Sequence, residues 1–304
     1  MNGQFWQGFW RLADPKISLA SFASMFLGAC AAAANGALDF LWLAITVIGI
    51  FAVEVAKNAS GDIFDFISGN DQAIREEDRS PFSGGKRVLI DGLLTRGQTA
   101  GIALIGYIIG TLCGLAIVRW REPSVLWIGV AGVALAFFYH APPIKLAYRG
   151  LGEIAVAVAY GPLIGTGTYL VQRGIITIDI TVVSMLLGIL IGLFLLANEF
   201  PDYHADEIAS KKTLVVRLGR QRASRLFAAL LTLTFIGLAV LPLFGSPLTL
   251  WFGMIAMIPA YSAGKLLLGN PEVTSRIIPA QAKTLVTFLV FSAGTSIGCL
   301  LGQL

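Results

Sequence analysis

Two stretches of the sequence place asparagine and aspartate at intervals of about one helical turn. They contain Asn58, Asp62 and Asp65 in the first stretch and Asn198, Asp202 and Asp206 in the second. Because an α-helix turns once every 3.6 residues, each set shares one face of a helix. If the two faces met, four carboxylates would repel one another unless a cation neutralised them. Carboxylate and amide oxygens at this density predict a Mg²⁺ site, completed by waters and phosphate oxygens.

The residues before each motif form an apolar run of membrane-spanning length. The first motif follows "FLWLAITVIGIFAVEVA", and similar runs recur along the whole chain. The chain is 56% hydrophobic and 13% charged, whereas soluble domains carry about 25% charged residues. About 20 apolar residues suffice for a helix to cross a bilayer. The composition therefore predicts an integral membrane protein built from helices.

We predict an all-α, polytopic fold with about nine transmembrane helices, bundled around a central pocket that opens to the cytoplasmic side. The expected spans are residues 17–35, 39–58, 97–118, 123–139, 152–171, 178–198, 223–242, 247–268 and 281–302. Four spans separate the two motifs, and this even number puts both motifs on the same side of the membrane. The whole chain, 1–304, is expected to form one domain of tandem half-repeats covering roughly 17–139 and 152–302.

The distribution of lysine and arginine predicts the orientation in the membrane. With the N-terminus inside, the outer loops carry only Arg119, Arg121 and Arg173, and nearly all other basic residues face the cytoplasm. This asymmetry is typical of the positive-inside rule, so the basic charge does not imply nucleic acid as a partner. We expect the N-terminus and the long polar loops 59–96 and 199–222 to be cytoplasmic and the C-terminus to be outside. Pro201, within the second motif, is expected to kink or end its helix.

Basic residues follow both acidic motifs. Arg79 lies in the first long loop, and Lys145 and Arg149 lie in "FFYHAPPIKLAYRG" between the fourth and fifth spans. Cations beside a carboxylate–Mg²⁺ cluster are what a diphosphate needs, since they neutralise charge on a departing group. These residues therefore suggest chemistry on a diphosphate substrate at the cytoplasmic face.

Other polar residues near the motifs have two readings each. Glu54 shares the first motif's face one turn deeper, where it either pairs with Lys57 or lines a substrate pocket. Glu153 opens the fifth span and is a candidate for contact with either the acceptor or the donor. His140 either assists a deprotonation or makes a structural hydrogen bond. Paired acids on parallel helices are also compatible with a divalent-cation or proton-coupled transporter.

The motifs together resemble the UbiA superfamily of intramembrane aromatic prenyltransferases over essentially the whole chain. "NASGDIFDFISGND", "YHAPPIKLAYRGLGEI", "YGPL" and "KKTLVVRLGR" are similar to its menaquinone-type branch, in which the acceptor is 1,4-dihydroxy-2-naphthoate. Gly69 and Asp71 match the tail of the first motif in that branch. Gly61 departs from the Asn or Tyr common there, and "ANEFPD" has one Asn where two are common.

The resemblance implies Mg²⁺-dependent transfer of a polyprenyl group from a prenyl diphosphate to an aromatic acceptor, most similar to the step of menaquinone biosynthesis in a bacterial inner membrane. It implies Mg²⁺ ligation by Asn58, Asp62, Asp65, Asn198, Asp202 and Asp206. It implies substrate contacts by Asn58, Asn198, Arg79, Arg149, Glu54, Glu153 and Asp71, and catalytic roles for Asp62, Asp65, Asp202, Asp206, Lys145 and Tyr139. The aromatic face of Tyr139 would stabilise an allylic cation. Other acceptors of the superfamily, namely 4-hydroxybenzoate, homogentisate or a tetrapyrrole, remain alternatives, and membrane lipid surrounds the protein.

Overall fold

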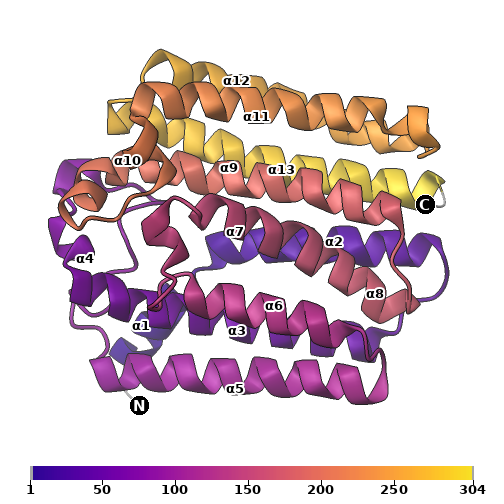
Figure 1. The fold of residues 1–304 in the computed structure, drawn as a ribbon, viewed down its shortest axis with the longest axis horizontal. Coiled ribbons are helices and arrows are strands. Elements are labelled where there is room, and N and C mark those ends of the chain that lie inside the picture. The colour runs from indigo at the N-terminus through magenta and orange to yellow at the C-terminus, as the bar shows by residue number, and fades with distance from the viewer. Residues whose placement is uncertain (1–2, 303–304) are drawn as a thin grey trace.

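The computed structural model describes residues 3–302, and these residues form helices and connecting loops without a strand. The helices lie side by side in a bundle (Figure 1). Within this described part of the chain, eight segments are long and apolar enough to cross a membrane. They are α2 (Pro15–Ala34), α3 (Phe40–Ser68), α5 (Arg96–Trp120), α7 to α8 (Gly152–Arg173), α9 (Ile178–Ile208), α11 to η4 (Arg220–Phe244), η5 to α12 (Leu248–Gly269) and α13 (Thr274–Gly302).

The fourth predicted span, residues 123–139, corresponds to α6 (Val125–Phe138), which has only 14 residues. At 1.5 Å per residue this helix is about 21 Å long, which is shorter than a bilayer core of roughly 30 Å. The prediction of helical, membrane-spanning architecture is confirmed, and α6 is the segment on which the count of nine depends.

Both helices that carry the acidic motifs are longer than the sequence pattern predicts. We expected them to end at residues 58 and 198, but α3 continues to Ser68 and α9 to Ile208. The first stops at Gly69, which adopts a φ of 79° that costs glycine little. Pro201 lies inside α9 and does not end it. The motifs therefore lie on rigid helices, because polar side chains near a bilayer surface do not have to terminate a helix.

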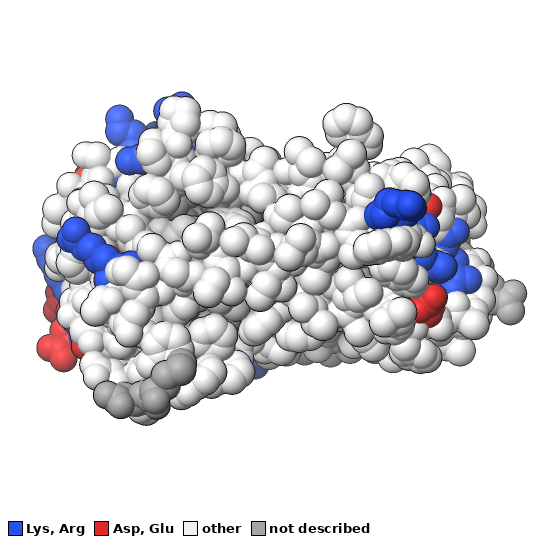
Figure 2. Space-filling view, turned by 90° about the horizontal axis from the view of Figure 1, so that it is seen from below, with Lys and Arg blue, Asp and Glu red and all other residues white. Residues whose placement is uncertain are grey.

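The two ends of the bundle are polar and the middle is apolar. Lys, Arg, Asp and Glu gather at both ends of the face shown in Figure 2, and the band between them is almost free of charge. The short helices α1 (Gly3–Ala13), α4 (Asn70–Ala73) and α10 (Leu214–Leu218) share one end of the bundle, whereas α13 finishes at the opposite end (Figure 1). We call the end with α4 and α10 the motif end, since α3 and α9 both terminate there.

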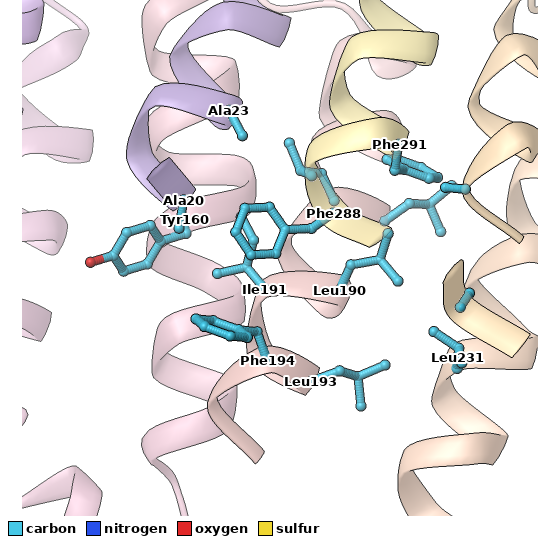
Figure 3. Packing of buried hydrophobic residues seen from close by; sticks show 14 of the residues in the cluster. Ala20, Ala23, Tyr160, Leu190, Ile191, Leu193, Phe194, Leu231, Phe288 and Phe291 are labelled. Atoms are coloured by element: carbon cyan, nitrogen blue, oxygen red, sulfur yellow. The ribbon is translucent and has the colours of Figure 1, made fainter. Parts of the chain in front are cut away.

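The largest cluster of buried hydrophobic residues surrounds α9 and α13. Phe288 and Phe291 of α13 and Leu190 of α9 are completely buried, and Phe194 packs edge-on against Phe288 (Figure 3). On the most apolar stretch of α9, 72% of the residues are buried, compared with 28% on α3. Burial of aromatic and aliphatic side chains at native density fixes the position of α9 within narrow limits.

Candidate functional site

The first motif binds the loop that follows it. Both carboxylate oxygens of Asp62 accept hydrogen bonds, from the backbone N–H of Val88 at 3.2 Å and of Leu89 at 3.1 Å. The amide of Asn58 donates to the carbonyl of Leu12 at 2.8 Å. These bonds hold α1 and the segment 79–95 against α3 at the motif end. The backbone of these two segments therefore covers the acidic face of α3.

Asp65 contacts the loop between α6 and α7. The Tyr148 hydroxyl donates to Asp65 Oδ1 at 2.7 Å and lies 2.9 Å from the Ser68 hydroxyl. On the other oxygen, His140 Nε2 lies 3.7 Å from Asp65 Oδ2. Burial lowers the pKa of His140 to about 4 despite the nearby Asp65 carboxylate. The imidazole is therefore neutral near pH 7, and its buried Nδ1 has no hydrogen-bond partner.

The glycine that departs from the menaquinone-type pattern makes room for this histidine. A Cβ at Gly61 would lie 2.6 Å from Cε1 of His140, closer than real Cβ contacts. The imidazole therefore packs directly against the backbone of α3, one turn before Asp65. We conclude that Gly61 and His140 form a matched pair in this chain.

The second motif leaves several oxygens without partners. Asp202 accepts from the N–H of Gly84 at 3.3 Å through Oδ2, while its Oδ1 is buried and unpaired. Asn198 Oδ1 is also buried without a partner. Asp206 lies 3.5 Å from the ammonium of Lys211 and accepts from the Asn70 amide at 3.1 Å. Asn70 lies in α4, so this bond joins the segment after the first motif to the second motif.

Lys211 connects the two motifs electrostatically. Burial by itself would lower the pKa of its ammonium, but the carboxylates of Asp206, Asp65 and Asp202 together raise this pKa well above the usual value. Burial, together with the charges of Asp65 and Asp62, raises the pKa of Asp71 to about 7. Carboxylates from α3, α4 and α9 therefore face a common region, with the Lys211 ammonium as their counter-charge.

The donors in this region fit a hard divalent cation. Asp71 Oδ1, Asn198 Oδ1 and Asp202 Oδ1 are buried oxygens without hydrogen-bond partners, and oxygen-only donor sets are those that Mg²⁺ prefers. Within residues 3–302, however, no three His, Cys, Asp or Glu side chains are close enough together to hold a metal ion. The oxygens share a region but are not drawn to a single point.

The predicted basic residues differ in their distance from this region. The Lys145 ammonium lies 5.2 Å from the centre of the Tyr148 ring, whose hydroxyl contacts Asp65. Arg149 is exposed and donates to the carbonyl of Pro143 at 2.8 Å. Arg79 is exposed as well, and its guanidinium makes no ion pair within the described chain. The structure thus brings Lys145 to the edge of the site and leaves Arg79 and Arg149 outside it.

Glu153 joins the second motif to the start of α10. One carboxylate oxygen accepts from the N–H of Leu214 at 2.9 Å, and the other is buried without a partner. The carboxylate of Glu199, which follows Asn198 in α9, lies close enough to Glu153 for the two charges to interact. Glu153 therefore caps and positions neighbouring backbone, and its second oxygen remains free for a ligand.

An apolar cavity of about 190 Å³ adjoins the site and extends among α3, α5, α6 and the α7 to α8 segment. Glu54 lines it and accepts from the Ser21 hydroxyl at 2.8 Å and the Tyr160 hydroxyl at 2.9 Å. Tyr160 lies in the first turn of a π-helical stretch, η3 (Ala159–Thr166), a type of irregularity often found at functional sites. The cavity also contacts Tyr139, whose ring lies 4.7 Å from that of His140.

Several residues of the site were not predicted as such from the sequence. Lys211 lies in the stretch "KKTLVVRLGR" but was given no role of its own. The backbone N–H groups of Gly84, Val88 and Leu89 carry no signal in the side chains of these residues. A signal for Lys211 existed, since it is the first basic residue after the second motif. A turn in which its N–H bonds to the carbonyl of Asp206 at 2.7 Å returns it to that motif.

Comparisons with known proteins agree with this geometry. Residues 21–276 match the UbiA prenyltransferase family. The 1,4-dihydroxy-2-naphthoate octaprenyltransferase of Bacillus subtilis is 26% identical, over 97% of this chain and 93% of that protein. The Escherichia coli enzyme of the same name is 28% identical, over 76% and 74%. The structure of a UbiA homologue from Archaeoglobus fulgidus bound to GPP and Mg²⁺ superposes with a TM-score of 0.63 at 13% identity, covering 95% of this chain and 100% of that chain.

Proposed function

Because the chain belongs to the UbiA prenyltransferase family, it is a prenyltransferase, and we propose that it transfers a polyprenyl group from a prenyl diphosphate to 1,4-dihydroxy-2-naphthoate with the help of Mg²⁺. Relatives named for this naphthoate reaction support the acceptor. The observation that carries the proposal is the meeting of two Asn–Asp motifs, from α3 and α9, beside an apolar cavity. Family membership also favours the enzyme over a transporter.

We propose that the diphosphate binds at the motif end. Mg²⁺ would be held there by Asn58, Asp62, Asp65, Asn198, Asp202 and Asp206, and it would supply positive charge against the diphosphate. Asp62 already accepts two backbone hydrogen bonds, but each carboxylate oxygen has a second lone pair for a cation. The unpaired oxygens of Asn198 and Asp202 are free without any rearrangement of partners. Asp71 supports the same site from α4.

Basic and aromatic groups around the carboxylates suit the departure of a diphosphate. Lys145 and Lys211 both lie against the ring of Tyr148, at 5.2 Å and 5.7 Å, so two ammonium groups flank the same edge of the site. They would neutralise the leaving group as the C–O bond breaks. The ring of Tyr139 lies between this edge and the cavity, where its π-face would stabilise an allylic cation. The segment 79–95 covers the acids and limits the access of water.

The location follows from the family and the charge pattern. The protein is an integral membrane protein, and we place it in a bacterial inner membrane with the motif end and N-terminus cytoplasmic. The isoprenoid tail would then lie among helices and lipid chains while the diphosphate remains at the aqueous face. The division into tandem halves remains a prediction, supported by the repetition of the motif on α3 and α9.

The test is an assay of purified protein in lipid nanodiscs with Mg²⁺, a long-chain prenyl diphosphate and a panel of aromatic acceptors. We expect a prenylated, decarboxylated naphthoquinol and no product when Mg²⁺ is chelated. Prenylation of only 4-hydroxybenzoate, homogentisate or a tetrapyrrole would overturn the acceptor. Full activity of the Asp62→Asn, Asp202→Asn double variant would overturn the metal assignment.

A further inference from the structure

The cavity beside the site has a polar inner end that the proposed chemistry leaves unexplained. Lys57, Glu54, Tyr139 and Tyr160 line this end, and the rest of the lining is almost entirely apolar. We propose that Lys57 binds the carboxylate of the aromatic acceptor and thereby selects aromatic acids over neutral rings. This inference rests on the proposed function, because it assigns a place to the acceptor of that reaction.

Lys57 has no partner that neutralises it in the described structure. Its natural partner one turn earlier, Glu54, is used elsewhere, because its two oxygens accept from the hydroxyls of Ser21 and Tyr160. Asp14, another nearby acid, forms an ion pair with Lys86. Among residues 3–302 the Lys57 ammonium makes no ion pair and no hydrogen bond. It makes a cation–π contact with Tyr139, 5.5 Å from the centre of the ring.

An ammonium facing an apolar cavity favours an anionic ligand. A charge removed from water without a counter-ion is costly, and an ion pair with the ligand would offset part of that cost. The neighbouring groups that face the cavity are hydroxyls and hydrocarbon, so a carboxylate placed there meets one cation and little repulsion beyond Glu54. Glu54 already accepts hydrogen bonds from two hydroxyls, which stabilise its negative charge without an ion pair to Lys57.

The position of Lys57 also places such a ligand next to the reacting groups. Lys57 contacts Tyr139, the ring of Tyr139 lies 4.7 Å from that of His140, and His140 lies 3.7 Å from Asp65. A flat ring whose carboxylate is held by Lys57 would therefore lie beside Tyr139, between the cavity and the acidic region. Aromatic side chains at this end provide the apolar, edge-on surfaces that ring systems prefer.

The single positive charge of Lys57 at the polar end of the cavity suits the acceptor better than the donor. A diphosphate carries several negative charges and would be matched by the cations and carboxylate-bound metal at the motif end, whereas one lysine suits a monoanion. The apolar lining suits either an aromatic ring or the tail of the donor. Occupation by the donor tail alone is therefore the competing outcome that the experiment must separate.

The test compares Lys57→Met with wild type, using 1,4-dihydroxy-2-naphthoate and the same ring without its carboxylate, 1,4-dihydroxynaphthalene. Loss of a charged hydrogen bond is worth about 1.5–3 kcal/mol, or roughly a 10- to 100-fold change. We expect KM for the naphthoate to rise by about this factor, with KM for the prenyl diphosphate and for the neutral ring unchanged. Lys57→Arg should retain the preference for the acid. Lys265→Met, an exposed lysine on α12, is the matched control and should behave as wild type.

Equilibrium binding separates the two levels of the proposal. Calorimetric titration of naphthoate into the protein without donor should show weaker binding for Lys57→Met and wild-type binding for Lys265→Met, at unchanged thermal stability. An unchanged naphthoate KM in Lys57→Met, or a rise in donor KM instead, would overturn this inference while leaving the proposed function intact. Wild-type protein that transfers no prenyl group to any acceptor would overturn the proposed function itself.

Discussion

The two helices that carry the Asn–Asp motifs are built into the bundle in different ways. The most apolar stretch of α9 is 72% buried and lies in the core of Figure 3, whereas that of α3 is 28% buried and borders the cavity. The same chemical motif is thus presented by one helix fixed in a packed core and by another that forms a wall of the ligand space. Precise placement of ligands requires at least one rigid support.

The hydrogen-bond partners of the motif residues also differ between α3 and α9. On α3, Asp62 and Asp65 are bonded to the covering segment and to Tyr148. On α9, Asn198 Oδ1 and Asp202 Oδ1 have no partners. The α9 side therefore offers free oxygens from a fixed position, and the α3 side is tied to loops that a substrate could rearrange. The following predictions test this division.

The largest effect is expected for the charge of Asp206. Asp206→Asn should lower kcat/KM for prenyl transfer by about 10³-fold, because losing one group that acts on a developing charge typically costs 10²- to 10³-fold. Glu207, the next residue, is an exposed acid. Because an exposed charge contributes little, Glu207→Gln should change kcat/KM less than about twofold. Equal losses of kcat/KM in the two variants would contradict this prediction. They would show that negative charge anywhere at the motif end is enough, and that its position on the motif face of α9 has no effect.

Removal of the Lys211 ammonium should destabilise the metal-free protein. Its loss leaves Asp206 and its neighbours as uncompensated buried charges, a change that costs about 3–5 kcal/mol. Thermal unfolding in detergent with a chelator should show a lower Tm for Lys211→Met, and millimolar Mg²⁺ should restore most of the difference. The exposed neighbour Lys212 gives the control Lys212→Met, for which no such Mg²⁺-dependent recovery is expected. A Tm for Lys211→Met equal to wild type in chelator would contradict the role of Lys211 as counter-charge.

Matched leucine truncations should separate the core from the cavity wall. Leu190 on α9 is fully buried, whereas Leu135 on α6 borders the cavity. Leu190→Ala should cost about 2–5 kcal/mol of unfolding free energy, because it creates a new void in a packed region. Leu135→Ala enlarges an existing space and should cost about 1 kcal/mol, close to the lost transfer energy of its methyl groups. Denaturation of the two variants under one condition measures the difference, and equal losses would refute the contrast.

The smallest effect concerns the pairing of Gly61 with His140. Gly61→Ala places a Cβ 2.6 Å from the imidazole, so His140 must move away from Asp65, and activity should fall by about tenfold, an overpacking cost near 1–3 kcal/mol. Adding His140→Ala to Gly61→Ala should recover part of the loss. Gly101→Ala on α5, where the added Cβ meets nothing within 4 Å, should leave activity unchanged. No recovery in the double variant would show that the two positions are independent.

Much of the architecture could be predicted from the sequence, because apolar runs of membrane length and turn-spaced acids are local patterns. The helix ends could not be predicted, since Asp62 and Asp202 are polar yet remain helical where backbone N–H groups of the covering segment bond to them. Lys57 looked like the end of a span, but α3 continues for eleven residues beyond it, to Ser68. Its approach to Tyr139 depends on the packing of α3 against α6, which no local pattern encodes.

The central claim is that α3 and α9 together form one Mg²⁺-dependent diphosphate site. The most direct measurement is calorimetric binding of a non-reactive prenyl thiolodiphosphate to wild type, Asp65→Asn, Asp202→Asn and the double variant, with and without Mg²⁺. We predict Mg²⁺-dependent binding by wild type, at least a tenfold loss in each single variant, and a loss in the double variant smaller than the product of the two, since groups that act as one unit are not additive. Wild-type binding that is unaffected by chelation, or strictly independent losses, would contradict the account.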